Sequence, residues 1–206
     1  MLALVFAASL ASAFVAVNVF MADILTLQAR WQVNQWQRNP LLQPAPTEIG
    51  KVRNALTVGL DWRPGDPQLI ELRGYLYGVR AIRAQRLPQL RNSLLDEVIA
   101  HFQQSLSRRP MSPYAWIALA QALEMRDGLG PAFWSAYDRA LAYGFREGGV
   151  QVRLVALALR HWDAAGSEHQ AKIQQIVNQA RGGAKGEILR LLKVFGKESL
   201  RTDRLG

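Results

Sequence analysis

Apolar and polar positions in this chain recur with a helical spacing. Four times, an apolar residue is followed four positions later by another apolar or aromatic residue, and seven positions later by a small one. Because a helix turns once every 3.6 residues, about two turns of one helix face carry each triplet. The triplets are Val52, Leu56 and Gly59; Val98, Phe102 and Ser105; Phe133, Tyr137 and Ala140; and Ile173, Val177 and Ala180. No run alternates with a period of two over several residues, so we predict no sheet.

Proline-containing turns separate these helical segments. Pro64 and Pro110 each follow a triplet by five residues, and an aromatic or apolar residue opens the next helix. This order of paired helices is typical of tetratricopeptide-like arrays, whose strict repeat is about 34 residues long. The triplets here begin 46, 35 and 40 residues apart. We therefore expect a degenerate array with long turns.

The turn residues also place the ends of the expected helices. Thr47, Asp66, Ser112 and Ser167 are predicted N-caps, because their side-chain oxygens can accept hydrogen bonds from the first backbone amides of a helix. The expected helices cover residues 47–60, 67–86, 88–107 (or 90–107), 113–125, 131–144, 149–162, 167–182 and 185–195.

The N-terminal segment has a different pattern. Residues 1–22 contain no charged side chain, and Asp23 is the first. A helix of that length rises about 33 Å, which is enough to cross the hydrocarbon core of a bilayer. We therefore predict a transmembrane anchor over residues 1–28. Aromatic and basic residues that are typical of the head-group level follow it, namely Arg30, Trp31, Trp36 and Arg38.

Two other interpretations of this segment remain open. A cleaved signal peptide would fit the small residues Ala11, Ser12 and Ala13, but no basic residue precedes the apolar run. A buried core helix would also be apolar. The direction in which the helix would cross the membrane is left open by the charges, because long domains translocate largely regardless of them.

Three further segments follow the predicted anchor. Residues 29–46 are a predicted juxtamembrane linker, because Pro40, Pro44 and Pro46 prevent a continuous helix. Residues 47–196 form the predicted repeat domain, and residues 197–206 form a basic C-terminal tail. The predicted fold class is all-α, with a single transmembrane helix followed by a degenerate tetratricopeptide-like α-solenoid of about seven to eight helices.

The repeat pattern also predicts the core. Small residues let neighbouring helices approach, and Gly74 and Gly78 predict one close helix–helix crossing. The predicted core residues are Val52, Leu56, Tyr77, Val98, Phe102, Trp116, Leu119, Phe133, Tyr137, Ala140, Ile173, Val177 and Ala180.

Composition changes this picture in two ways. The chain has 25 basic and 16 acidic side chains and a net charge of +9, which favours anionic partners such as phospholipid or an acidic glycan. A merely solvated basic surface is the alternative, and without a recognisable nucleic-acid fold we expect no nucleic-acid partner. The chain has no cysteine, which excludes disulfides, thiol catalysis and cysteine-ligated zinc.

The sequence shows no catalytic constellation. His101, His161 and His169 lie on three different expected helices, and none has a histidine partner four residues away. We therefore expect no metal, no cofactor and no enzymatic activity.

One stripe of residues is a candidate binding site. Arg73, Tyr77 and Arg80 share one face of an expected helix, and Arg83 lies one turn beyond. Guanidinium groups can hold anionic groups, and the tyrosine can stack on a sugar ring. Alternatively, Tyr77 packs in the core and the arginines are solvated.

The segment 109–123, RPMSPYAWIALAQAL, together with 133–144, FWSAYDRALAYG, resembles the tetratricopeptide-like region of VpsP-type polysaccharide biosynthesis proteins of Gram-negative bacteria. The block Arg-Pro-x-Ser-Pro-x-x-Trp is its distinctive part. The resemblance covers residues 47–195 and carries no catalytic residues. It implies a part in building or exporting exopolysaccharide at the inner membrane, with the repeat domain in the periplasm.

From these observations we expect a non-catalytic, membrane-anchored scaffold that binds protein subunits of an envelope assembly. An anionic glycan or phospholipid is a further candidate ligand. An assembly factor for another envelope machine, such as a pilus or secretion system, is the alternative. An enzyme would instead need clustered carboxylates or histidines, which the sequence does not show.

Overall fold

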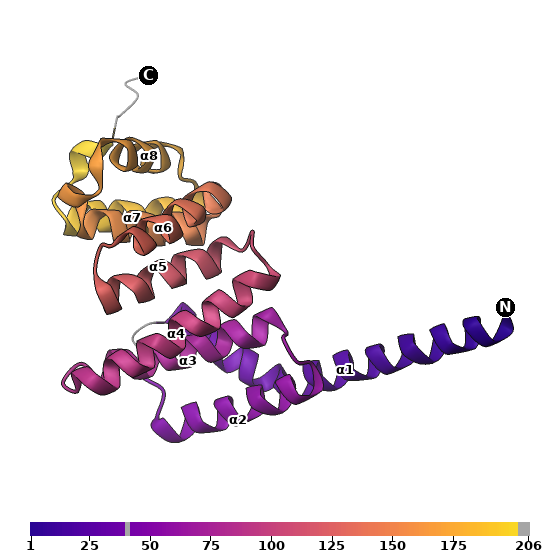
Figure 1. Cartoon of the computed structure of the whole chain (residues 1–206). Coiled ribbons are helices and arrows are strands. Elements are labelled where there is room, and N and C mark those ends of the chain that lie inside the picture. Colours follow the sequence, from indigo (N-terminus) through magenta and orange to yellow (C-terminus); the bar gives the residue numbers. More distant parts are fainter. Residues whose placement is uncertain (40–41, 202–206) are drawn as a thin grey trace. The chain divides into compact units, whose positions relative to one another are not determined.

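The computed structural model describes residues 1–39 and 42–201, and in these ranges it contains helices and no strand (Figure 1). This confirms the predicted all-α class with a long apolar N-terminal helix. Eight α-helices follow that helix within the described residues. The α-helices are α1 (Leu2–Arg38), α2 (Pro46–Trp62), α3 (Pro67–Arg83), α4 (Pro88–Arg108), α5 (Pro113–Asp127), α6 (Pro131–Gly144), α7 (Gly148–Arg160), α8 (Gly166–Gln179) and α9 (Gly182–Val194). Two short 3-10 helices cover Trp162–Ala164 and Glu198–Leu200.

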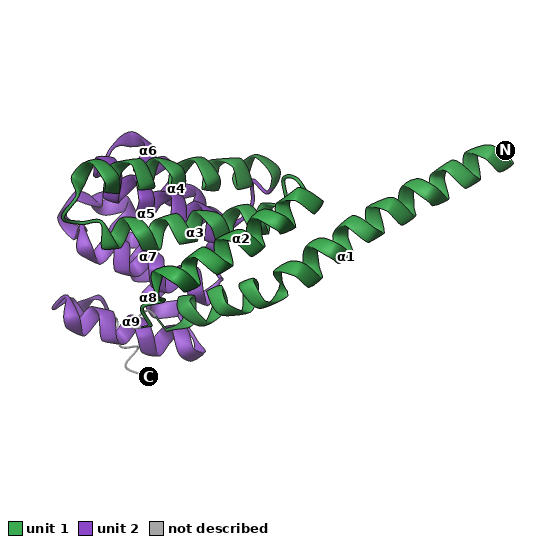
Figure 2. Ribbon diagram, turned by 90° about the horizontal axis from the view of Figure 1, so that it is seen from below, with its two compact units in different colours: residues 1–108 green, residues 109–206 purple. Residues whose placement is uncertain are grey.

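The chain divides into two compact units, residues 1–108 and 109–206 (Figure 2). Unit 1 contains α1 to α4, and unit 2 contains α5 to α9. The segment that we predicted as one repeat domain, 47–196, is therefore shared between two units. Within unit 1, α1 packs with α2 and α3 packs with α4, so each pair forms a helical hairpin, and the first hairpin includes the helix that we predicted only as an anchor.

The second half of α1 belongs to the core of unit 1. Ala22, Thr26, Ala29, Val33 and Trp36 recur with alternating steps of four and three, and all are buried. This seam packs against α2, with Ile49, Val52 and Leu56 in the same apolar cluster. A helix with such a seam gains stability from packing even where glutamines surround the apolar positions.

Two predictions about this region were therefore wrong. Residues 29–38 are not a linker, because α1 continues to Arg38 before its backbone becomes irregular at Asn39. Pro40 lies outside the described residues. Trp36 is not available as a residue exposed to head groups, because it is buried against α2, whereas Trp31 is exposed.

The helix starts confirm two of the predicted N-caps. Asp66 Oδ1 accepts hydrogen bonds from the amides of Gln68 and Leu69 at 2.8 and 3.1 Å. Ser112 Oγ accepts one from the Ala115 amide at 3.4 Å. Each cap precedes a proline, whose missing N–H is not needed in the first helical turn.

The other two predicted N-caps were wrong. α2 begins at Pro46, with Ala45 as its N-cap and the Glu48 carboxylate accepting a hydrogen bond from the Ala45 amide, so Thr47 already lies inside the helix. α8 follows the 3-10 helix almost directly, and its N-cap is Ala165. Ser167 therefore lies within the first turn of α8 and is not its N-cap.

The four triplets all lie in the interior. Each of their twelve residues is buried, as is Leu119. Two predicted core residues differ, because Tyr77 and Trp116 are only half-buried. Trp116 lies at a helix start, where its Nε1 donates to the Pro110 carbonyl at 2.7 Å and the Arg139 guanidinium covers its ring at 4.8 Å. The polar edge of the indole thus keeps it at the surface.

α3 and α4 approach closely at Gly74. A Cβ there would lie 3.1 Å from the Cβ of His101 and 3.3 Å from the ring of Phe102. One turn later, a Cβ at Gly78 would have its nearest neighbour, Val98 Cγ2, at 3.9 Å. Gly74 therefore makes the close crossing that the sequence predicts, and Gly78 only borders it.

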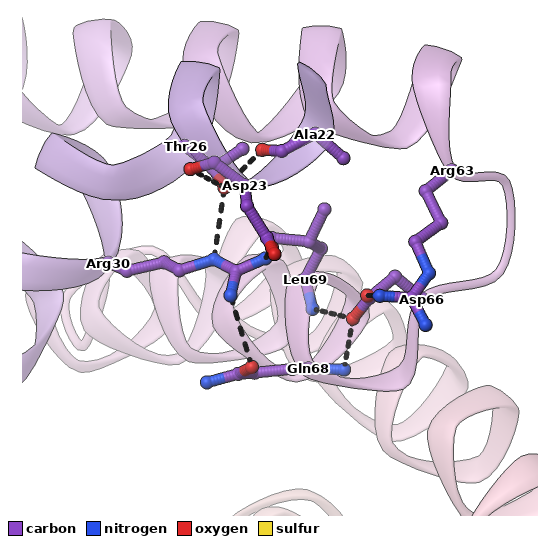
Figure 3. A network of polar contacts seen from close by, with 8 residues as sticks. All are labelled: Ala22, Asp23, Thr26, Arg30, Arg63, Asp66, Gln68 and Leu69. Atoms are coloured by element: carbon purple, nitrogen blue, oxygen red, sulfur yellow. Dashed lines mark hydrogen bonds and ion pairs between the residues drawn. The ribbon is translucent and has the colours of Figure 1, made fainter. Parts of the chain in front are cut away.

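α1 and α2 meet still more closely at Gly59. A Cβ there would overlap the methyl group of Thr26 and lie 3.1 Å from Leu69 Cδ1. Thr26 cannot easily rotate away, because its Oγ1 donates to the Ala22 carbonyl at 2.6 Å and accepts from Arg30 Nε at 2.9 Å (Figure 3). The absence of a side chain at Gly59 thus allows α1 to lie against α2.

We predict that Gly59→Ala destabilises unit 1, whereas Gly50→Ala in the same helix does not. Both changes gain helix propensity, but a Cβ at Gly50 meets nothing within 4 Å. The overlap at Gly59 should cost about 1–3 kcal/mol relative to that control. Thermal unfolding of the two variants measures the difference. Adding Thr26→Ser, which removes the methyl group, should restore stability, and a variant that unfolds like the control would contradict this packing.

Candidate functional site

A groove of about 500 Å³ opens in unit 1 between α2, α3 and the start of α4. Most of the side chains that line the groove are either arginines or apolar residues, chiefly leucines. None of the described residues that line it is acidic. The lining residues are Pro46, Ile49, Gly50, Arg53, Arg73, Leu76, Tyr77, Arg80, Arg83, Ala84, Leu87, Leu90 and Leu94.

The candidate stripe on α3 forms one side of this groove. Arg73, Tyr77, Arg80 and Arg83 all line it. Tyr77 is half-buried, with its ring centre 5.1 Å from that of His101 on α4. The Arg80 guanidinium lies 5.9 Å from the centre of the Tyr77 ring. The Tyr77 side chain therefore forms part of the groove wall, together with the arginines of the stripe, and does not fill the core.

Two of these arginines differ in their surroundings. Arg83 Nη2 donates to the Pro44 carbonyl at 2.7 Å, which ties the end of α3 to the segment before α2. Arg73 Nε is buried and has no hydrogen-bond partner among the described residues. A buried N–H without an acceptor costs about 1–3 kcal/mol. An acceptor supplied by a ligand would remove that cost.

The floor and lip of the groove are apolar. Ile49, Leu76 and Leu94 are buried at the floor. Leu87 and Leu90 line the opening and are 59% and 45% exposed. The site therefore suits a ligand that has both anionic groups and apolar groups.

Sequence reasoning missed part of this site. Arg53 and the leucines at the start of α4 were not predicted, because they come from helices other than α3. A signal for Arg53 was present, since it lies four residues after the buried Ile49 and so near the same face of α2.

None of the three histidines lines the groove, and each has a hydrogen-bond partner, which for His101 is the Glu97 carbonyl at 2.7 Å. His161 Nε2 contacts Glu124 Oε1 at 2.6 Å, and Arg160 also reaches this carboxylate. His169 Nε2 contacts Asp138 Oδ1 at 2.7 Å, and its ring stacks on Trp134. Within the described residues, no group of three or more His, Cys, Asp or Glu side chains could hold a metal ion.

Tyr137 is a further ionisable group inside unit 2. Its hydroxyl donates to the Leu154 carbonyl at 3.1 Å, which joins α6 to α7. Burial, with a smaller contribution from the charge of Asp138, raises the pKa of Tyr137 well above its usual value. The hydroxyl therefore stays protonated and serves as a structural donor.

The predicted basic tail is described only in part. Lys197 Nζ lies 5.6 Å from the centre of the Trp162 ring, so the first tail residue folds back onto unit 2. Residues 202–206, which include Arg204, lie outside the described residues.

No protein-family model matches this chain, and no curated protein matches it. The resemblance to VpsP-type proteins is carried by residues 109–123 and 133–144. The geometry of the arginine-lined groove is thus the main basis for a functional proposal.

Proposed function

We propose that this protein is a non-catalytic, membrane-anchored scaffold whose groove binds an acidic segment of a partner protein. The observation that carries the proposal is the set of four arginines, Arg53, Arg73, Arg80 and Arg83, around an apolar floor without an acidic lining residue. Guanidinium groups pair with carboxylates in a two-pronged geometry. Leucines beside them would hold the apolar side chains of the same segment.

Membrane anchoring rests on α1. It is long and apolar enough to cross a bilayer, and its most apolar stretch is not buried by the rest of the chain. Such a helix would hold the scaffold at the membrane, with the groove on whichever side carries unit 1. We propose the periplasmic side of a bacterial inner membrane, which the resemblance implies.

The groove favours a peptide over a glycan. An acidic glycan could satisfy the arginines and stack on Tyr77, but it offers little apolar surface to Leu87 and Leu90. An acidic peptide with apolar residues satisfies both halves of the site. The resemblance supports a role in a surface-polysaccharide assembly, which we propose for this protein. A pilus or secretion assembly is the alternative.

A photo-crosslinking experiment tests this proposal. The full-length protein carries p-benzoylphenylalanine in place of Leu87, at the groove, or of Met111, which is exposed in unit 2. Irradiation of native membranes should give a protein adduct from position 87 and not from 111. Mass spectrometry then identifies the adduct.

Each outcome has a defined meaning. Glycosyltransferases, a flippase, a polymerase or export subunits in the adduct support the polysaccharide assembly. Pilus or secretion components support the alternative. No protein adduct at position 87 contradicts a partner protein in the groove.

A further inference from the structure

The uncharged apolar segment of α1, residues 1–22, reaches into the part of α1 that packs against the rest of unit 1. Residues 1–17 are exposed, Asn18 and Val19 are half-buried, and Ala22 is fully buried. The exposed stretch alone rises about 25 Å, which is less than the roughly 30 Å of a hydrocarbon core. If α1 spans a membrane, unit 1 therefore begins to cover it where the hydrocarbon ends.

The turn between α2 and α3 lies at that end of unit 1. α2 runs antiparallel to α1, since Ile49 shares a cluster with Trp36 while Gly59 lies against Thr26 and the Ala22 carbonyl. Figure 3 shows Arg63 beyond Ala22, on the side away from Arg30. The residues after Gly59 thus lie beside the last turns of the apolar segment.

The side chains of this turn suit the lipid head-group layer. Trp62 is 38% exposed, and its ring combines an apolar body with a polar N–H. Arg63 Nη1 pairs with Asp66 Oδ2 at 2.9 Å, but a guanidinium has about five N–H donors. The Arg108 guanidinium lies over Gly65. One tryptophan and two guanidiniums therefore surround one turn, next to the exposed carboxylate of Asp61.

We propose that the α2–α3 turn, with Trp62, Arg63 and Arg108, docks unit 1 onto the bilayer surface by binding phospholipid phosphates. This rests on the proposed membrane anchoring by α1. It has a consequence for the groove, because α3 leads away from the turn and Arg80 lies about 21 Å along the helix from Asp66. Head groups bound at the turn are then too far away to contact Arg80, so we infer that the groove's ligand comes from outside the bilayer.

Because the chain has no cysteine, single labels can measure this docking. Spin labels are attached at Pro64→Cys in the turn, Gln85→Cys at the far end of α3, and Ser12→Cys in the apolar segment. The full-length protein is reconstituted in phosphatidylcholine–phosphatidylglycerol vesicles. Accessibility to oxygen and to a nickel chelate then reports the depth of each label.

The expected depths are hydrocarbon for position 12, head group for position 64 and water for position 85. The pair Trp62→Ala and Arg108→Gln should make the label at 64 more accessible to the nickel chelate, because the turn then rests less deeply, whereas Arg146→Gln in unit 2 should not. A label at 64 in water or in hydrocarbon, or one that the paired change leaves in place, overturns the docking but leaves the anchor. A label at 12 in water overturns the anchor itself.

Discussion

Replacing Arg73 and Arg80 together by glutamine should abolish capture of the partner in the groove. Both guanidiniums line it, and Arg73 already has a buried Nε without a partner. Hydrogen bonds to charged groups contribute about 1.5–3 kcal/mol each, so losing two should weaken binding about a hundredfold or more. The yield of the adduct from position 87, and the affinity of the identified partner segment, measure the loss.

The matched control removes the same charge elsewhere. Arg146 and Arg190 are exposed in unit 2, and changing both to glutamine lowers the net charge by the same amount. If binding depended only on net charge, this control would lose as much affinity as the groove variant. An unchanged control beside a weakened groove variant assigns the effect to the site. Equal losses, or no loss in either, would contradict the groove.

Phe133→Ala should be among the most destabilising changes in unit 2. Phe133 is buried on α6 beside Trp134 and Tyr137, and His169 of α8 stacks on Trp134. Removing a buried phenylalanine ring costs about 3–5 kcal/mol, because the cavity closes only partly. Thermal and denaturant unfolding of the full chain should show unit 2 melting well below its normal temperature.

Trp116→Ala is the informative comparison for this prediction. It removes a larger side chain, but the indole is half-buried and contributes mainly one hydrogen bond to Pro110 and the contact with Arg139. These contributions amount to about 1–2 kcal/mol. A loss for Trp116→Ala equal to that for Phe133→Ala would show that Trp116 is a core residue, contrary to the structure.

Local features of the fold could be predicted from the sequence. The four triplets are buried because helical periodicity alone places their members on one face, and an isolated apolar face must find a partner. Asp66 and Ser112 cap helices because the cap bond involves only neighbouring residues. The stripe of Arg73, Tyr77 and Arg80 is likewise a property of one helix.

Other features depend on contacts between distant segments. The sequence between Ala29 and Arg38 is rich in glutamine, so its apolar seam is not evident from the sequence. The packing against α2 in the structure reveals it. Trp116 differs from Phe133 because its N–H has an acceptor at the surface, which composition alone does not reveal.

By itself, the sequence determined the helical class, the long apolar N-terminal helix and the face of α3 that carries the arginines, because each follows from spacing within one segment. Only the tertiary structure decided that this face borders a groove, that Arg53 and the leucines of α4 complete it, and that the rest of unit 1 packs against one face of α1 from Ala22 onward. Those outcomes depend on how helices far apart in the sequence pack, and side-chain shape decides that packing.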